Sequence, residues 1–129
     1  MRVLPCWSVL VILLLGSACG GPTAPAEPPH LRGTVTSVGT QDGYREFLVK
    51  DVEFLIGGQQ GDRDNCGIYV AADRRTQVWH RTSDGTLRRA ALADVQVGTA
   101  VEVRHTGLIL DSCPAQARAE SVVLVASVP

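Results

Sequence analysis

The chain has 129 residues, and since roughly the first thirty lack the pattern of a folded domain, the remainder suffices for one domain and not two. Its charges nearly cancel, with 12 Lys and Arg against 13 Asp and Glu. Surfaces that bind nucleic acid or anionic membranes need a clustered basic excess, so this balance argues against both kinds of partner.

The N-terminal segment, residues 1–18, has the pattern of a signal peptide. Arg2 supplies a minimal positive region, residues 9–15 are apolar, and Gly16, Ser17 and Ala18 are the small residues expected before a cleavage site. The apolar run is shorter than the roughly 20 residues that span a bilayer. An uncleaved anchor helix is the alternative.

The sequence Leu15-Gly16-Ser17-Ala18-Cys19 resembles the lipobox of bacterial lipoproteins. The resemblance implies that Cys19 receives a diacylglycerol, becomes the first mature residue and anchors the protein to a membrane of the cell envelope. Gly16 stands where Leu is usual. Because Gly16 and Ala18 also satisfy the small-x-small rule of ordinary signal peptidase, a soluble secreted protein cut near Ala18 is the alternative.

Residues 19–30 are predicted to form a flexible tether that carries the lipid. The stretch 20–29 is dominated by Pro, Gly and Ala, and it has too few apolar side chains to offset the entropy of ordering. The chain therefore divides into a signal peptide at 1–18, a lipidated tether at 19–30 and a folded domain at 31–129. That domain is expected to face the periplasm or the exterior.

The folded part shows short apolar alternations separated by turn residues, which is typical of β-structure. The apolar phase of the second alternation changes midway, which predicts a β-bulge near Lys50 and Asp51. A short helical turn is expected within residues 87–97. Strands are expected over residues 31–38, 46–56, 66–70, 76–82, 100–106 and 118–126.

This pattern predicts an all-β domain, a small five- or six-stranded Greek-key barrel of the OB-like type with one short helical turn. A small open sandwich is the alternative.

The four cysteines have separate predicted fates. Cys6 is lost with the signal peptide and Cys19 is the candidate for lipidation. The two that remain, Cys66 and Cys113, allow one pairing, and an exported compartment permits a disulfide, so we predict a Cys66–Cys113 bond. Two separate buried thiols are the alternative. The sequence has no CxxC motif, so redox chemistry is not expected. Two cysteine ligands are too few for a metal site.

The C-terminal half carries several short motifs: the turn at residues 92–98, the strand at 101–103, Gly107 and the segment 111–119. On these motifs it resembles a family of small exported bacterial domains of unknown function, many of them lipoproteins, with an OB-like barrel. Cys113 stands where that family commonly has an aromatic residue. The resemblance implies the fold and the export, and it implies no activity.

Motifs for catalysis are weak, so we expect no enzyme and no cofactor. The serines lack a Gly-x-Ser-x-Gly context, and no glycine-rich phosphate loop is present. Asp51 and Glu53 share a strand face, which a solvated edge explains. Asp62 and Asp64 match the start of a calcium loop only in part, because Cys66 replaces the third ligand. We interpret that stretch as a polar loop.

The three histidines make a weak case for a metal. His30 falls in the tether, while His80 and His105 lie on different predicted strands and could meet across a sheet. Without a third ligand, a zinc site is not expected.

Aromatic residues in the predicted strands suggest a binding face. Tyr69 and Trp79 lie in strands, with Arg81 near Trp79, and OB barrels bind oligonucleotides or sugars by stacking on such residues. Alternatively, Trp79 covers the end of the barrel. The favoured function is a non-enzymatic envelope domain that binds a protein, a glycan or a small ligand. The alternatives are a purely structural or interaction protein and an oligonucleotide-binding barrel.

Overall fold

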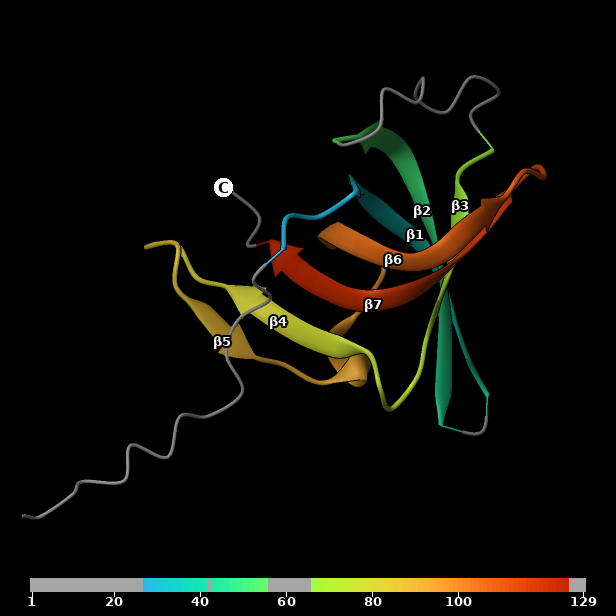
Figure 1. Cartoon of the computed structure of the whole chain (residues 1–129). Helices are drawn as coiled ribbons and strands as arrows, with labels where there is room; N and C mark the ends of the chain where they lie inside the picture. Colours follow the sequence, from blue (N-terminus) through green and yellow to red (C-terminus); the bar gives the residue numbers. More distant parts are fainter. Residues whose placement is uncertain (1–26, 42, 56–65, 126–129) are drawn as a thin grey trace, which may run out of the picture.

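The computed structural model describes residues 27–41, 43–55 and 66–125. Figure 1 shows an all-β domain, as predicted, and no helix in these residues is long and apolar enough to cross a membrane. The 3-10 turn η1 (Leu92–Asp94) is the predicted helical turn. The strands are β1 (Leu31–Gln41), β2 (Tyr44–Phe54), β3 (Ile68–Ala72), β4 (Gln77–Arg81), β5 (Leu87–Arg89), β6 (Ala100–Leu110) and β7 (Ala115–Val125).

The described residues form seven strands, whereas five or six were predicted. The additional strand is β5, which lies inside the segment expected to hold only a helical turn. It has three residues, too few for a visible alternation, and it is held by pairing with β4, Trp79 opposite Arg89 and Arg81 opposite Leu87. Its existence depends on this tertiary pairing.

The strands form one sheet in the order β3-β2-β1-β6-β7-β4-β5, and β3 also pairs with β7. This extra pairing closes β1, β2, β3, β6 and β7 into a barrel-like ring of hydrogen-bonded strands, visible in Figure 1. The closing β3–β7 pair is parallel, with Ile68 opposite Ala115 and Ala71 opposite Arg118. Further along β7, residues 121–125 pair with β4, also in parallel.

The β-bulge predicted near Lys50 and Asp51 is confirmed in β2. Between two register pairs, β2 contributes Asp51 and Val52 where β1 contributes only Gly33. Asp51 has a φ of 54°, and the extra residue lets Val49 and Val52 both point into the core. Gly33 is required opposite the bulge, because a Cβ there would lie 2.5 Å from the carbonyl oxygen of Lys50 and from a methyl of Val49.

The core lies inside the ring and is built mainly from valine. Val95, which follows η1, is fully buried and joins this core. Arg45 of β2 holds it there, since its Nε and Nη2 donate to the Val95 carbonyl oxygen at 3.1 and 2.6 Å. The largest fully buried side chains are Phe47, Leu31, Val35, Val49, Val70, Val95, Val101, Val103 and Val122.

Candidate ligand-binding groove

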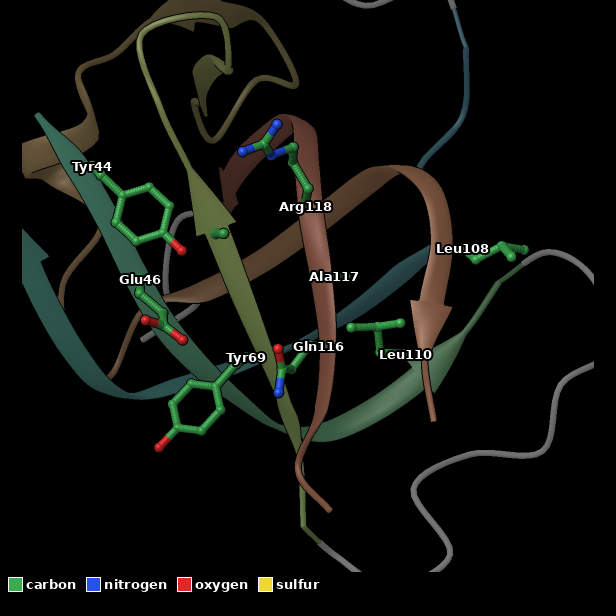
Figure 2. Close-up of a pocket in the computed structure, with 9 residues that line it drawn as sticks. Tyr44, Glu46, Tyr69, Leu108, Leu110, Gln116, Ala117 and Arg118 are labelled. Atoms are coloured by element: carbon green, nitrogen blue, oxygen red, sulfur yellow. The ribbon is translucent and has the colours of Figure 1, made fainter. Parts of the chain in front are cut away.

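An open hollow of about 200 Å³ lies on the outer face of β2, β3, β6 and β7. We call it the tyrosine groove, because it is lined by Tyr44 and Tyr69, the two tyrosines of the whole chain. Figure 2 shows the side chains of the tyrosine groove. Its lining residues are Tyr44, Glu46, Tyr69, Ala71, Leu108, Leu110, Gln116, Ala117 and Arg118.

Strand register explains why the surface is hollow at this point. Ala71 of β3 lies opposite Glu46 of β2 on one side and opposite Arg118 of β7 on the other. Paired residues share a face of a sheet, so the two long charged side chains flank a single methyl group. Two strand spacings of about 4.8 Å each place the backbones of Glu46 and Arg118 roughly 10 Å apart. These two side chains form no ion pair in the described structure.

The polar side chains of the groove are free to meet a ligand. Within the described structure the side chains of Tyr44, Glu46, Tyr69, Gln116 and Arg118 make no hydrogen bond or ion pair. Polar groups that converge on a hollow without satisfying one another are a common feature of binding sites.

The end of β6 supplies an apolar rim. Leu108 is 90% exposed and Leu110 is 60% exposed, and the two side chains lie two residues apart at the groove. Both lie opposite the tyrosines across the groove, as Figure 2 shows. The tyrosine groove therefore combines an apolar edge with a polar, aromatic floor.

The structure brings Cys66 and Cys113, the predicted disulfide partners, to disulfide distance at the start of two strands that line the groove. Cys66 precedes β3 and Cys113 precedes β7, with Cα atoms 5.4 Å apart, inside the range of disulfides. The Ala115 backbone N–H donates to the Gly67 carbonyl oxygen just beyond it. The bond therefore fixes the start of the parallel β3–β7 pair, whose Tyr69 and Gln116 form the groove floor.

The structure does not bring Tyr69, Trp79 and Arg81 to one face. Tyr69 lines the tyrosine groove, whereas Trp79 is only 3% exposed and has the Arg89 guanidinium 5.1 Å from its ring centroid. Arg81 is engaged in an ion pair with Glu102. The expectation of a shared face was wrong because β3 and β4 pair with different halves of β7.

Four polar residues of the groove were missed by reasoning from the sequence: Tyr44, Glu46, Gln116 and Arg118. The second strand was expected to begin at residue 46, so Tyr44 was left outside it, whereas β2 begins at Tyr44. Gln116 and Arg118 meet Tyr69 only through the parallel pairing of distant segments, which leaves no local signal. The one signal in the sequence that could have pointed to the groove was that the chain has only two tyrosines.

A second polar cluster joins residues 27–30 to β6, which corrects the prediction for the histidines. His105 meets His30, with ring centroids 4.3 Å apart, whereas His80 is exposed on β4. The His105 backbone N–H donates to Nδ1 of His30 at 3.2 Å, and the His30 N–H donates to the Val103 carbonyl oxygen. His30 is thus docked on the domain and not free in the tether.

Arg104 of β6 also binds the segment of residues 27–30. Its guanidinium donates to the Pro28 carbonyl oxygen at 2.9 Å and to Glu120 at 3.1 Å, and it forms an ion pair with Glu27. Arg104 and its partners are partly exposed, so the ion pairs contribute little individually. Together with His30 they define where the chain meets the domain.

The docking of His30 should make stability depend on pH. Desolvation lowers the pKa of His30 from its usual 6.5, and the positive charges of His105 and Arg104 lower it further, against the opposing effect of Glu120 and Glu27. A lowered pKa means that the unfolded chain binds the proton more readily. The free energy of unfolding should therefore fall as the pH drops below about 6.5.

Urea unfolding at about pH 8 and about pH 5.5 measures this dependence, since the two values bracket the usual histidine pKa. His30→Asn keeps an acceptor near the Nδ1 position and cannot be protonated in this range, so it should reduce the loss of stability at the lower pH. His80→Asn is the matched control and should leave the loss unchanged. An undiminished loss in His30→Asn would show that other groups cause it.

Metal binding was not expected, and among the described residues no three His, Cys, Asp or Glu side chains gather closely enough to hold an ion. Asp62 and Asp64, which were weighed as part of a calcium loop, lie outside the described residues.

Comparison of the chain with protein-family models, with curated proteins and with solved structures finds no match.

Proposed function

We propose that the chain is an exported bacterial lipoprotein whose OB-like domain binds a ligand in the tyrosine groove, as an accessory protein of the cell envelope. The observation that carries the proposal is the gathering around one hollow of five polar side chains, both tyrosines among them, that have no hydrogen-bond or ion-pair partner in the described part of the chain. OB-like barrels present ligand sites on the faces of neighbouring strands. The lining includes no Ser, Cys or His, which favours binding over catalysis.

The proposed location depends on the N-terminus. Residues 1–18 have the pattern of a signal peptide, and Cys19 stands where a lipobox would place the acylated cysteine. The disulfide supports export, because such bonds persist in oxidising compartments. Acylation at Cys19 would hold the domain at a membrane by burial of hydrocarbon, at ~0.8 kcal/mol per CH₂.

A different function, as an interaction protein without a small ligand, is favoured by one observation. Leu108 and Leu110 project from the end of β6 and would be buried against a protein partner. Oligonucleotide binding has less support, because the groove contains one arginine and one glutamate and lacks a basic cluster.

Intact-mass analysis of the membrane fraction tests the anchor. We expect a chain that begins at Cys19 and carries the additional mass of the acyl groups. Cys19→Ala should shift the protein to the soluble fraction, whereas Cys6→Ala, upstream of the cut, should leave it in the membrane. An unmodified chain cut near Ala18 would show that the protein is secreted in soluble form.

The NMR signals of tyrosine rings test ligand binding, because both tyrosines lie in the groove. The full-length chain, labelled at tyrosine and held in a zwitterionic detergent, is titrated with a protein-free extract of bacterial envelopes. We expect saturable shifts of both ring signals. Rings that do not respond would contradict a ligand-binding groove and leave the interaction protein as the better proposal.

A further inference from the structure

We infer that the ligand of the tyrosine groove is a neutral oligosaccharide. This inference rests on the proposed function, since it names the chemical class that the same groove would take. Four features of the groove favour such a ligand: its aromatic rings, its mixture of free hydrogen-bonding groups, its balanced charge and the pairing of its floor strands.

The two tyrosines provide stacking surfaces on either side of a carboxylate. Figure 2 shows Glu46 between the rings of Tyr44 and Tyr69. Tyr44 and Glu46 are two residues apart on β2 and share its outer face, while Tyr69 comes from the neighbouring β3. A sugar ring has an apolar face of C–H groups that can pack on an aromatic ring, while its hydroxyl groups reach polar side chains beside that ring.

The free polar groups differ in what they can donate and accept. Glu46 only accepts hydrogen bonds, Arg118 only donates them, and Gln116 and the tyrosine hydroxyls do both. Each of these side chains lacks a partner in the described structure. Hydroxyl groups donate and accept at once, so a polyhydroxylated ligand can satisfy all of them. A phosphate, which offers only acceptors when fully ionised, would leave Glu46 unpaired and repelled.

Charge and strand pairing argue against the other polymers. Glu46 and Arg118 cancel each other across Ala71, so the groove offers no excess charge for an ionic chain. An extended peptide could add to the sheet only at a free strand edge. The floor strand β3 has none, because β2 pairs with one edge and β7 with the other.

The size of the hollow suits one sugar residue within a longer chain. Its volume of about 200 Å³ is smaller than the roughly 300–1,000 Å³ of sites that enclose a drug-sized ligand. The groove is open, so an oligosaccharide could place one ring over Ala71 and continue across the tyrosines. Leu110 and Leu108 would bound its course on the β6 side.

Titration with defined neutral oligosaccharides tests the inference. Maltohexaose, cellohexaose and chitohexaose are added to the tyrosine-labelled full-length chain in a zwitterionic detergent without a sugar headgroup. We expect at least one of them to shift both tyrosine signals saturably. Tyr69→Ala should weaken the affinity roughly 2- to 10-fold, as read from Tyr44, because one stacking ring is lost. Arg88→Ala, on the exposed edge of β5, is the matched control and should bind normally.

Periodate treatment of the envelope extract separates this inference from the proposed function. Periodate cleaves vicinal diols, which 1,4-linked hexoses carry in every residue, so it should abolish the shifts that a hexose glycan in the untreated extract causes; chitohexaose tests the N-acetylated sugars, which resist periodate within the chain. If the treated extract still shifts the rings and the three oligosaccharides do not, the glycan is wrong while ligand binding stands. If neither the oligosaccharides nor the untreated extract shifts the rings, both are wrong.

Discussion

Replacing Cys66 and Cys113 together by alanine should lower the free energy of unfolding by about 4 kcal/mol, the chain-entropy value for a sequence separation of 47 residues. The physical reason lies in the unfolded chain, which gains freedom when the cross-link is removed. A domain this small has a total stability of roughly 5–15 kcal/mol, so the loss would be a large part of it. Urea unfolding of the oxidised protein and of the double variant measures the difference.

The same substitution should loosen the groove before the rest of the sheet. The disulfide fixes the start of the β3–β7 pair, which is short, joins segments distant in sequence and closes the ring. Amide hydrogen exchange in β3 and in residues 115–118 should therefore accelerate more than exchange in the β1–β2 pair. The β1–β2 pair is longer and joins segments adjacent in sequence, so it should depend less on the cross-link.

A reducing agent provides the control for this prediction. It should destabilise the wild-type protein to about the level of the double variant and leave the double variant unchanged. A double variant that keeps the wild-type stability to within about 1 kcal/mol would show that the cross-link contributes little to folding.

The sequence indicated those features that depend on local patterns. Alternation of apolar residues predicted six of the strands. The change of phase around Lys50 and Asp51 predicted the bulge, because side chains alternate between the two faces of a strand, and only an extra residue lets the apolar side chains on both sides of it point into the core. The cysteine pairing followed from the compartment and from counting. Each of these depends on neighbouring residues or on simple exclusion.

The groove depended on information that local patterns do not carry. Tyr69 and Gln116 are brought together by a parallel pair of strands whose partners are separated by more than 40 residues of sequence. Trp79 looked like a surface aromatic, yet it is buried beneath Arg89 because β5 pairs with β4. His30 looked like part of a tether, yet contacts with Val103 and His105 of β6 hold it on the domain. Register between distant segments decided all three.

Truncation of Phe47 to alanine should produce a loss of similar or larger size, about 3–5 kcal/mol. Phe47 is the largest of the fully buried side chains, with an exposure of 0%. It lies opposite Val38 of β1 and Val70 of β3. Its removal would leave a cavity inside the closed ring, where the paired strands have little freedom to collapse. Chemical denaturation, with the slope compared to the wild type, gives the change in free energy.

Two further variants make this prediction decisive even if Phe47→Ala does not fold. Phe47→Leu keeps most of the apolar volume and should cost roughly 1–2 kcal/mol. Leu108→Ala removes a large apolar side chain that is 90% exposed, so it should change stability by less than about 0.5 kcal/mol. Equal losses in Phe47→Leu and Leu108→Ala would place the core elsewhere. The predicted order would show that Leu108 contributes little to folding, which is consistent with the proposed contact of the groove with a ligand or partner.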